Sequence, residues 1–185
     1  MVAHQPLELM VMVRIHAGQP KHMILYEEIL RQFQKQKVKY ILVGGMAFNL
    51  LGGERNTLDM DIIVEMADEN LRKIVKILKK AGYHVKQPVD PVMIADKKTR
   101  EDWVKNKNMK AFNFYRSKKS YEEVDIVIDS PVNYKDAVKN SLKVKIKGMN
   151  LNIISPEDFI KMKKVSGRDK DLEDIENLKM ARRAS

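Results

Sequence analysis

The sequence contains no cysteine among its 185 residues. This absence excludes disulfide bonds and thiolate metal sites, and with them the disulfide-rich secreted domains and the cysteine-based zinc modules. It agrees with a cytoplasmic location, which we expect for this protein. Apolar runs are also short. None approaches the roughly 20 residues that a membrane-spanning helix needs, so we expect no membrane partner.

Aromatic and acidic residues are also in short supply. Aromatic residues make up 6% of the chain, and 25 Asp and Glu stand against 35 Lys and Arg, which gives a formal net charge of +10. The electrostatic potential around a protein with this net positive charge favours polyanionic partners, for example a nucleotide or a nucleic acid. The alternative is a solvated lysine-rich surface. Hydrophobic residues make up 44% of the sequence, which is enough for a packed core in a chain of one-domain length.

The first 22 residues differ from the rest of the chain. They show no sustained helical or strand periodicity. We interpret residues 1–22 as a disordered leader or a mis-assigned start, with Met23 as the natural first residue. Residues 23–154 then form the core domain, and residues 155–185 form C-terminal helices packed on that core.

From residue 24 onward, apolar residues recur with helical and strand periods in alternation. This order predicts an α/β (α+β) fold with a mixed central β-sheet flanked by helices. We expect Asp68 to cap the helix that follows it, and Ser155 or Asp158 to cap the next-to-last helix. The predicted helices cover residues 24–36, 46–51, 68–81 and 97–107 and most of the chain after 155, and the predicted strands cover 39–43, 58–64, 84–86, 111–115, 124–128, 143–146 and 151–154.

Asp59 and Asp61 lie on the predicted strand 58–64. Alternate residues of a strand face the same side, so the two carboxylates are spaced roughly 6–7 Å along the chain. Oxygen ligands suit hard cations, and Mg²⁺ is usually held by one or two carboxylates plus substrate phosphates. The spacing alone is common: Asp169 and Asp171 repeat it at a helix start, where the helix dipole explains acidic residues. Whether Asp59 and Asp61 form a metal site must therefore be judged from the residues around them.

Two features upstream of the pair favour a phosphate ligand. Gly44 and Gly45 end the strand 39–43, and small residues at such a junction let backbone N–H groups approach a phosphate. The alternative is a tight turn that needs glycine. Arg55 and Thr57 bring a cation and a hydroxyl to the same rim, although Arg55 is also open to interpretation as an ordinary surface charge.

A third carboxylate, Asp125, interrupts the otherwise apolar strand 124–128. A buried, unpaired carboxylate is costly, so Asp125 needs a metal ion, a cationic side chain or solvent at the strand end. With Asp59 and Asp61 it completes the predicted catalytic and metal-binding set.

The order of these motifs resembles the minimal nucleotidyltransferases of the DNA polymerase β-like superfamily, closest to the AbiEii-type toxins and their stand-alone relatives. The resemblance covers roughly Tyr40 to Leu178. It rests on Gly44-Gly45-Met46-Ala47, Gly53, Arg55-Asn56-Thr57-Leu58-Asp59-Met60-Asp61, Val124-Asp125-Ile126, Ser155-Pro156-Glu157-Asp158-Phe159-Ile160 with Lys163, and Gly167-Arg168 with Lys170-Asp171 and Asp174-Ile175.

The resemblance implies a nucleotidyltransferase-like fold and the transfer of an NMP group from an NTP to an unidentified hydroxyl acceptor, RNA or protein. Asp59, Asp61 and Asp125 would hold two Mg²⁺ ions, with Mn²⁺ as the alternative metal. Asp125 would also help to deprotonate the acceptor hydroxyl. The Gly44–Gly45 turn would bind the triphosphate. The resemblance to the AbiEii-type toxins also implies an antitoxin partner that would neutralise the protein.

The C-terminal motif adds further candidates for nucleotide binding. By the same resemblance, Lys163 and Asp171 or Asp174 would contact the nucleotide, and the alternative is a solvated helix with oppositely charged pairs. One position departs from the wider superfamily, in which a serine hydroxyl touches phosphate where this chain has Gly45. Phosphate binding would then rest on backbone N–H groups.

Two questions stay open at the level of sequence. The chain is either an active enzyme or a catalytically inactive nucleotide- or nucleic-acid-binding module that retains the fold. The basic stretches Lys97–Lys110 and Lys143–Lys147 either form a groove for a tRNA or protein acceptor or belong to an ordinary charged surface.

Overall fold

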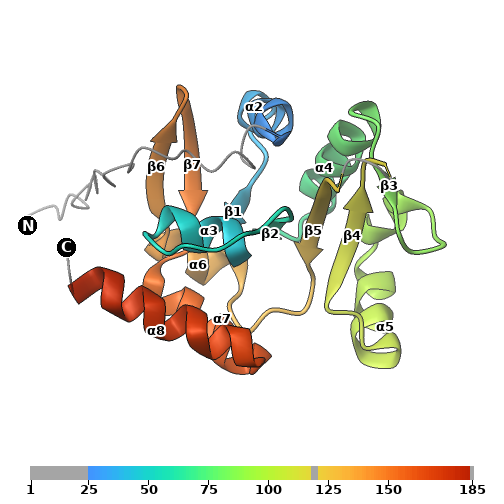
Figure 1. The fold of residues 1–185 in the computed structure, drawn as a ribbon. Helices are drawn as coiled ribbons and strands as arrows, with labels where there is room; N and C mark the ends of the chain where they lie inside the picture. Colours follow the sequence, from blue (N-terminus) through green and yellow to red (C-terminus); the bar gives the residue numbers. More distant parts are fainter. Residues whose placement is uncertain (1–24, 118–120, 184–185) are drawn as a thin grey trace, which may run out of the picture.

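The computed structural model describes residues 25–117 and 121–183, so the predicted leader 1–22 lies outside the described residues. Within these ranges seven strands form one mixed sheet, in the order β3-β4-β5-β2-β1-β7-β6 (Figure 1). The predicted α/β class with a mixed central sheet is confirmed. The strands are β1 (Tyr40–Leu42), β2 (Met60–Val64), β3 (His84–Val85), β4 (Ala111–Tyr115), β5 (Glu123–Val127), β6 (Leu142–Ile146) and β7 (Met149–Ile153).

The helices of the described residues occur between and after these strands. They are α2 (Glu27–Lys35), α3 (Gly44–Leu50), α4 (Asp68–Lys80), the 3₁₀ helix η1 (Pro91–Ala95), α5 (Lys97–Lys107), α6 (Tyr134–Asn140), α7 (Pro156–Ser166) and α8 (Asp169–Arg183). Ser155 caps α7 by accepting a hydrogen bond from the backbone N–H of Asp158, as one of the two predicted alternatives requires.

One face of the sheet is covered by α2, α4 and α5. Phe33 of α2 meets Tyr40 of β1 edge to face, with ring centroids 5.1 Å apart. Trp103 of α5 stacks on Phe112 of β4 at the same separation, and both rings are buried. α2 also contacts α4. This face therefore holds most of the aromatic core.

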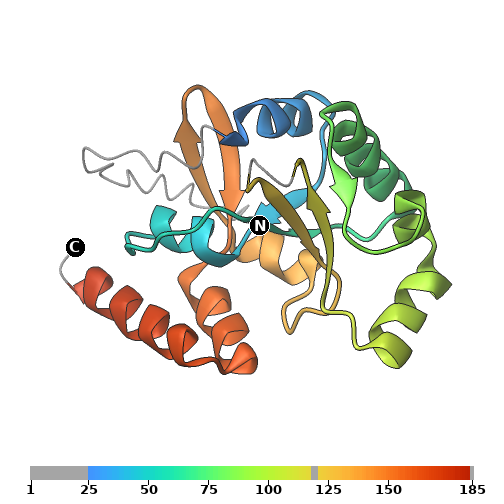
Figure 2. The same cartoon turned by 45° about the vertical axis from the view of Figure 1, so that its right-hand side comes forward.

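The opposite face is covered only in part. α3 packs against β2, and α6 packs against β1. Phe48 of α3 stacks on Phe159 of α7, and Figures 1 and 2 both place α7 and α8 beside α3 and away from α4 and α5. On β4 and β5, every second residue is partly exposed. These two strands thus present an open face, and the candidate site lies at its edge.

Several elements differ from the sequence-based expectation. The helix α6 and the short η1 were not predicted. α3 begins at Gly44, two residues before the predicted helix 46–51. Asp68 is the first residue of α4, and Ala67 takes the N-cap position, so the expected cap at Asp68 is wrong. The carboxylate still lies in the first turn, where the helix dipole favours negative charge.

Candidate active site

The Asp-x-Asp pair lies at the start of β2. Asp61 is the second residue of the strand and Asp59 immediately precedes it, so the predicted strand 58–64 begins two residues later than expected. β2 pairs in parallel with β5, and in this register Asp61 stands directly beside Asp125. Paired residues on neighbouring strands point to the same face of the sheet. The fold therefore brings residues that are far apart in the sequence to one position on the open face.

Burial and neighbouring carboxylates disfavour the charged form of each of the three aspartates. Burial, together with the charges of Asp125 and Asp59, raises the pKa of Asp61 to about 7. Burial also raises the pKa of Asp125, although a hydrogen bond from Asn113 acts in the opposite direction. The pKa of Asp59 is raised as well, again mainly by burial. A cation placed among these groups would relieve the repulsion.

One oxygen of Asp125 has no hydrogen-bond partner. Among the described residues, Oδ1 of Asp125 is the single buried side-chain nitrogen or oxygen in this state. Buried polar atoms are nearly always paired, and an unpaired acceptor costs about 1–3 kcal/mol. This oxygen therefore lacks the partner that a cation or a hydrogen-bond donor would supply.

The chemistry of the donor set suits a hard divalent cation. Three carboxylates gathered near one edge of the sheet supply the oxygen ligands that Mg²⁺ prefers. No three His, Asp or Glu side chains within residues 25–117 and 121–183 form a complete metal-binding group. The three carboxylates are ligands of the type that Mg²⁺ prefers. The presence of the ion stays a prediction.

Gly44 is required at its position for two independent reasons. Its φ angle of 63° lies in the left-handed region, which L-residues with a side chain rarely adopt. A β-carbon at this position would also overlap the carboxylate of Asp61. The backbone at the start of α3 can pass directly beside the carboxylate only because residue 44 is glycine.

Gly45 is close-packed for a different reason. A β-carbon on Gly45 would overlap the side chain of Thr57, which approaches the first turn of α3. The first N–H groups of a helix have no acceptor within the helix. The structure thus places the two predicted features, the glycine turn and the Thr57 hydroxyl, against each other and next to Asp61.

Arg55 is held in place through its main chain. The side-chain amide of Asn49 donates to the carbonyl of Arg55 at 2.8 Å, and the amide oxygen accepts from the N–H of Arg55 at 2.9 Å. Its guanidinium donates to Oδ2 of Asp174 at 2.5 Å. The loop that precedes Asp59 is therefore fastened both to α3 and to α8.

Lys163, Asp171 and Asp174, the C-terminal candidates, come together between α7 and α8. The Nζ atom of Lys163 lies 2.6 Å from an oxygen of each aspartate. All three side chains are buried, so the alternative of a solvated helix face does not describe them. Because Asp174 also binds Arg55, the cluster connects the C-terminal helices to the rim of the site.

Arg168 adds a second cation to this cluster, donating to Oδ2 of Asp171 at 2.8 Å. Burial alone would raise the pKa of Asp171, but the hydrogen bonds from Arg168 and Lys163 outweigh it and hold the pKa well below its usual range. The charge of Lys163 also acts on Asp61, whose pKa it lowers. The C-terminal cluster and the carboxylate site are thus electrostatically linked.

Sequence reasoning missed Tyr26, which holds two parts of the site together. Its buried hydroxyl lies 2.7 Å from the carbonyl oxygen of Leu58 and accepts a hydrogen bond from the N–H of Glu123 at 2.8 Å. Leu58 precedes Asp59, and Glu123 lies two residues before Asp125. Tyr26 therefore joins the segment just before β2 to the first residue of β5. No local signal distinguishes this tyrosine in the sequence.

A second group that the sequence did not identify surrounds Asp125. Lys86 pairs with Glu123 at 2.5 Å, and its positive charge lowers the pKa of both Asp59 and Asp125. Asn113 of β4 stands beside Asp125 in the antiparallel register of β4 and β5. Lys86 thus adds a positive charge near Asp59 and Asp125.

No helix in the described part of the chain is long and apolar enough to cross a membrane.

Residues 21–185 match a family model described as a nucleotidyltransferase of unknown function (DUF6036). A comparison with curated proteins found no match.

Solved structures share the fold. The lincosamide antibiotic adenylyltransferase LnuA, bound to lincomycin, is similar with a TM-score of 0.55 and 20% identity over 87% of this chain and 96% of that one. A candidate nucleotidyltransferase from Thermotoga maritima has a TM-score of 0.56 and 19% identity, over 86% of this chain and 92% of that one. ANT(2″)-Ia in complex with adenylyl-2″-tobramycin has a TM-score of 0.50 and 14% identity, over 90% and 97%.

Proposed function

Because the chain belongs to the family of nucleotidyltransferases of unknown function (DUF6036), we propose that it transfers an NMP group from an NTP to a hydroxyl acceptor. The observation that carries this proposal is the pairing of Asp61 with Asp125, where a buried carboxylate oxygen has no partner. An inactive module would have no use for this costly arrangement.

Asp59, Asp61 and Asp125 are the residues that would hold Mg²⁺, or Mn²⁺ in its place. When bound, the ions would neutralise charge on the reacting phosphate and on the attacking and leaving oxygens. The repulsion among the three carboxylates supports this assignment, because a cation lowers the cost of keeping them all ionised.

In the proposed reaction, the acceptor oxygen forms a bond to the α-phosphorus of the NTP. The bridging bond between the α-phosphorus and the oxygen of the β-phosphate breaks, and diphosphate leaves with the electron pair. The hydroxyl proton passes to the carboxylate of Asp125, which acts as the proton acceptor. The catalytic contribution of the protein is mainly positioning and charge stabilisation.

Gly44, Gly45, Arg55 and Thr57 are the residues that we propose for the triphosphate. The close approach of Gly44 to Asp61 supports this, because it brings the free N–H groups of α3 beside the carboxylates. Arg55 already pairs with Asp174. A triphosphate would therefore compete with Asp174 for this cation.

We also propose Lys163, Asp171 and Asp174 as contacts that organise the nucleotide site, as in the AbiEii branch. We propose a core of residues 23–154 with C-terminal helices, residues 155–185, packed on it. The ion pair between Asp174 and Arg55 supports this packing because it joins the two parts. A toxin–antitoxin setting, with RNA or a protein as acceptor and an antitoxin partner, is the biological context that this branch suggests. LnuA and ANT(2″)-Ia add a third acceptor class, the small hydroxylated molecule.

The proposal is tested by incubating the protein with each α-labelled NTP, Mg²⁺ or Mn²⁺, and a lysate that supplies RNA, protein and small molecules. We expect label transfer by the parent protein and none by Asp59→Ala or Asp125→Ala. Glu28→Ala, which removes an exposed carboxylate on α2, is the matched control and should transfer label normally. If the parent protein binds no metal–nucleotide complex at millimolar concentration, the enzymatic assignment is wrong.

A further inference from the structure

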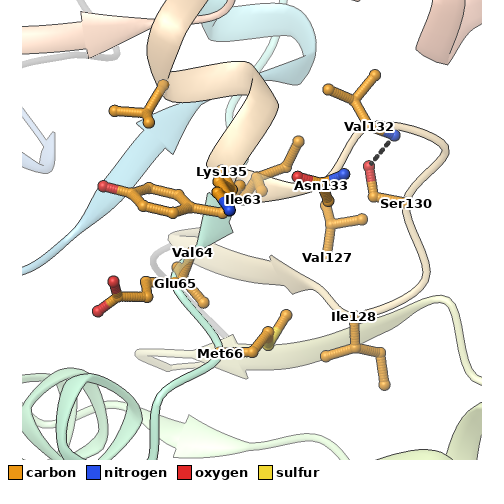
Figure 3. A pocket seen from close by; sticks show the side chains of 12 residues that line it. Ile63, Val64, Glu65, Met66, Val127, Ile128, Ser130, Val132, Asn133 and Lys135 are labelled. Carbon is orange, nitrogen blue, oxygen red and sulfur yellow. Dashed lines mark hydrogen bonds between the residues drawn. The ribbon is translucent and has the colours of Figure 1, made fainter.

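A pocket of about 610 Å³ lies beside the ends of β2 and β5 (Figure 3). Its walls come from the ends of these two strands and the residues just after them, from the segment that leads into α6, and from α6 itself (Figure 3). The volume is within the range of small-molecule sites, which is about 300–1,000 Å³. None of the residues proposed above for metal or nucleotide lines this pocket.

The register of the sheet relates this pocket to the carboxylates. Ile63 and Val127, which both line it, lie two residues beyond Asp61 and Asp125 on the same strands. Residues two apart face the same side, and the rise along a strand is about 3.3 Å per residue. The pocket therefore begins roughly 7 Å from the paired carboxylates, on the same face of the sheet.

The surface between the two places is not closed. Asp125 and Val127 are both partly exposed, and so is every second residue of the neighbouring strand β4. A molecule that occupies the pocket can thus extend along β5 toward the partly exposed carboxylate of Asp125.

The lining of the pocket is mainly apolar, and most of its polar groups already have partners. Glu65 pairs with Lys39 at 2.9 Å. The hydroxyl of Ser130 accepts from the N–H of Val132, and Asn133 caps α6. Such walls suit an apolar or aromatic group. They suit a triphosphate poorly, because Lys135 is the single cationic side chain among the lining residues and a triphosphate needs several cations and free N–H groups.

We infer that this pocket binds the apolar part of a small-molecule acceptor, whose hydroxyl then lies at Asp125. The inference rests on the proposed function and narrows its acceptor to a small molecule that carries both an apolar group and a hydroxyl. The transfer step is the one given above: the acceptor oxygen bonds to the α-phosphorus, diphosphate leaves, and the hydroxyl proton passes to Asp125. A nucleic acid acceptor would instead be bound through its phosphates on an open basic surface.

The first test uses two probes that share a sugar and differ in their apolar group, phenyl β-glucoside and methyl β-glucoside. The full chain is labelled at its Ile, Val and Met methyl groups and followed by NMR. We expect the phenyl compound to shift the resonances of Ile63, Val127 and Val138, and the methyl compound to bind at least about tenfold more weakly. If the phenyl compound shifts none of these resonances at millimolar concentration, or if an RNA oligonucleotide shifts them instead, the inference is overturned.

Variants of the pocket provide the second readout. Val138 lies on α6 at the edge of the pocket and is partly exposed, so Val138→Trp fills the space without disturbing the core. We expect this variant to lose phenyl glucoside binding by at least about tenfold and to keep its affinity for the Mn²⁺ complex of a non-hydrolysable NTP. Met180→Trp, on the exposed side of α8, is the matched control. Unchanged phenyl glucoside binding by Val138→Trp contradicts the inference.

Paramagnetic broadening by the same Mn²⁺ complex separates this inference from the proposed function. With both ligands bound, we expect the sugar protons of phenyl β-glucoside to broaden more than its ring protons, because the hydroxyls face the carboxylates. Stronger broadening of the ring overturns the acceptor role. If the complex itself does not bind, the proposed function fails, and shifts of the pocket methyls would then show a ligand site without an acceptor role.

Discussion

The hydroxyl oxygen of Thr57 lies 2.7 Å from the position that a β-carbon on Gly45 would take. A serine at position 45 would therefore collide with Thr57. The threonine brings a hydroxyl to nearly the same place from a different element. The two residues are thus alternative ways of supplying one hydroxyl to the first turn of α3.

This relationship predicts the outcome of a double-mutant experiment. Gly45→Ser alone should lower NTP affinity by at least about tenfold, because the new side chain overlaps Thr57. Thr57→Gly alone should also weaken binding, since it removes the hydroxyl. The combined variant should recover most of the affinity that either single change loses, as measured by calorimetric titration with a non-hydrolysable NTP. Additive losses would show that the two side chains act independently.

We predict that the carboxylate of Asp61 is needed for activity but lowers the stability of the metal-free folded protein. Its carboxylate is buried beside two others, and its pKa is raised to about 7, so its charged form is disfavoured in the folded state. Asp61→Asn removes this cost and should stabilise the metal-free protein at neutral pH by about 2 kcal/mol, while activity is lost. Urea unfolding in the presence of a chelator measures the change. A less stable variant would mean that the carboxylate makes favourable contacts in the metal-free state.

Asp171 is predicted to have the opposite effect. Its pKa is held below the usual value of 3.8, so the stability it contributes is present above that value and is lost as the pH falls below it. Asp171→Asn should destabilise the protein by about 3 kcal/mol at pH 7, because Lys163 and Arg168 lose a charged partner. The difference from the parent protein should shrink as the unfolding experiments move to increasingly acidic pH. Glu176→Gln, which breaks the exposed pair with Lys179, is the control and should cause no measurable change.

Tyr26 is predicted to be a positioning residue. Tyr26→Phe removes the hydroxyl that joins Leu58 to Glu123, at a cost of about 1–3 kcal/mol. Because this hydroxyl joins the segment just before β2 to the first residue of β5, next to the carboxylates, kcat should fall by more than about tenfold while NTP affinity changes little. Tyr40→Phe is the matched control: this buried tyrosine has no side-chain hydrogen bond to another described residue. Equal effects of the two variants on kcat would contradict a positioning role.

The parts of the fold that the sequence predicted well are those with strong periodicity. The helix 68–81 and the strands that carry Asp61 and Asp125 were located within two residues. The helix α6 was missed because its seven residues carry little apolar pattern and it depends on packing against β1. In a helix this short, tertiary contacts decide the structure more than propensity does.

The sequence identified candidate residues for the site, whose roles stay a prediction, but it did not indicate how these residues contact one another. The positions of Asp59, Asp61 and Asp125 came from motif order, yet the pairing of Asp61 with Asp125 depends on which strands are neighbours. Nor does local pattern indicate that Lys86, which follows β3, pairs with Glu123 and acts through its charge on Asp59 and Asp125. Such contacts are set by sheet topology, which one sequence does not specify.

The parallel register of β2 and β5 also restricts how this protein can evolve. Side chains alternate between the two faces of a sheet, so a one-residue slip of β5 would point Asp125 into the aromatic core beside Phe112 and Phe114. Inserting or deleting a single residue within β5 would thus remove the carboxylate from the site and bury it among apolar rings. We expect proteins related to this one to vary in the lengths of the loops that flank β5, while the length of the strand itself stays constant.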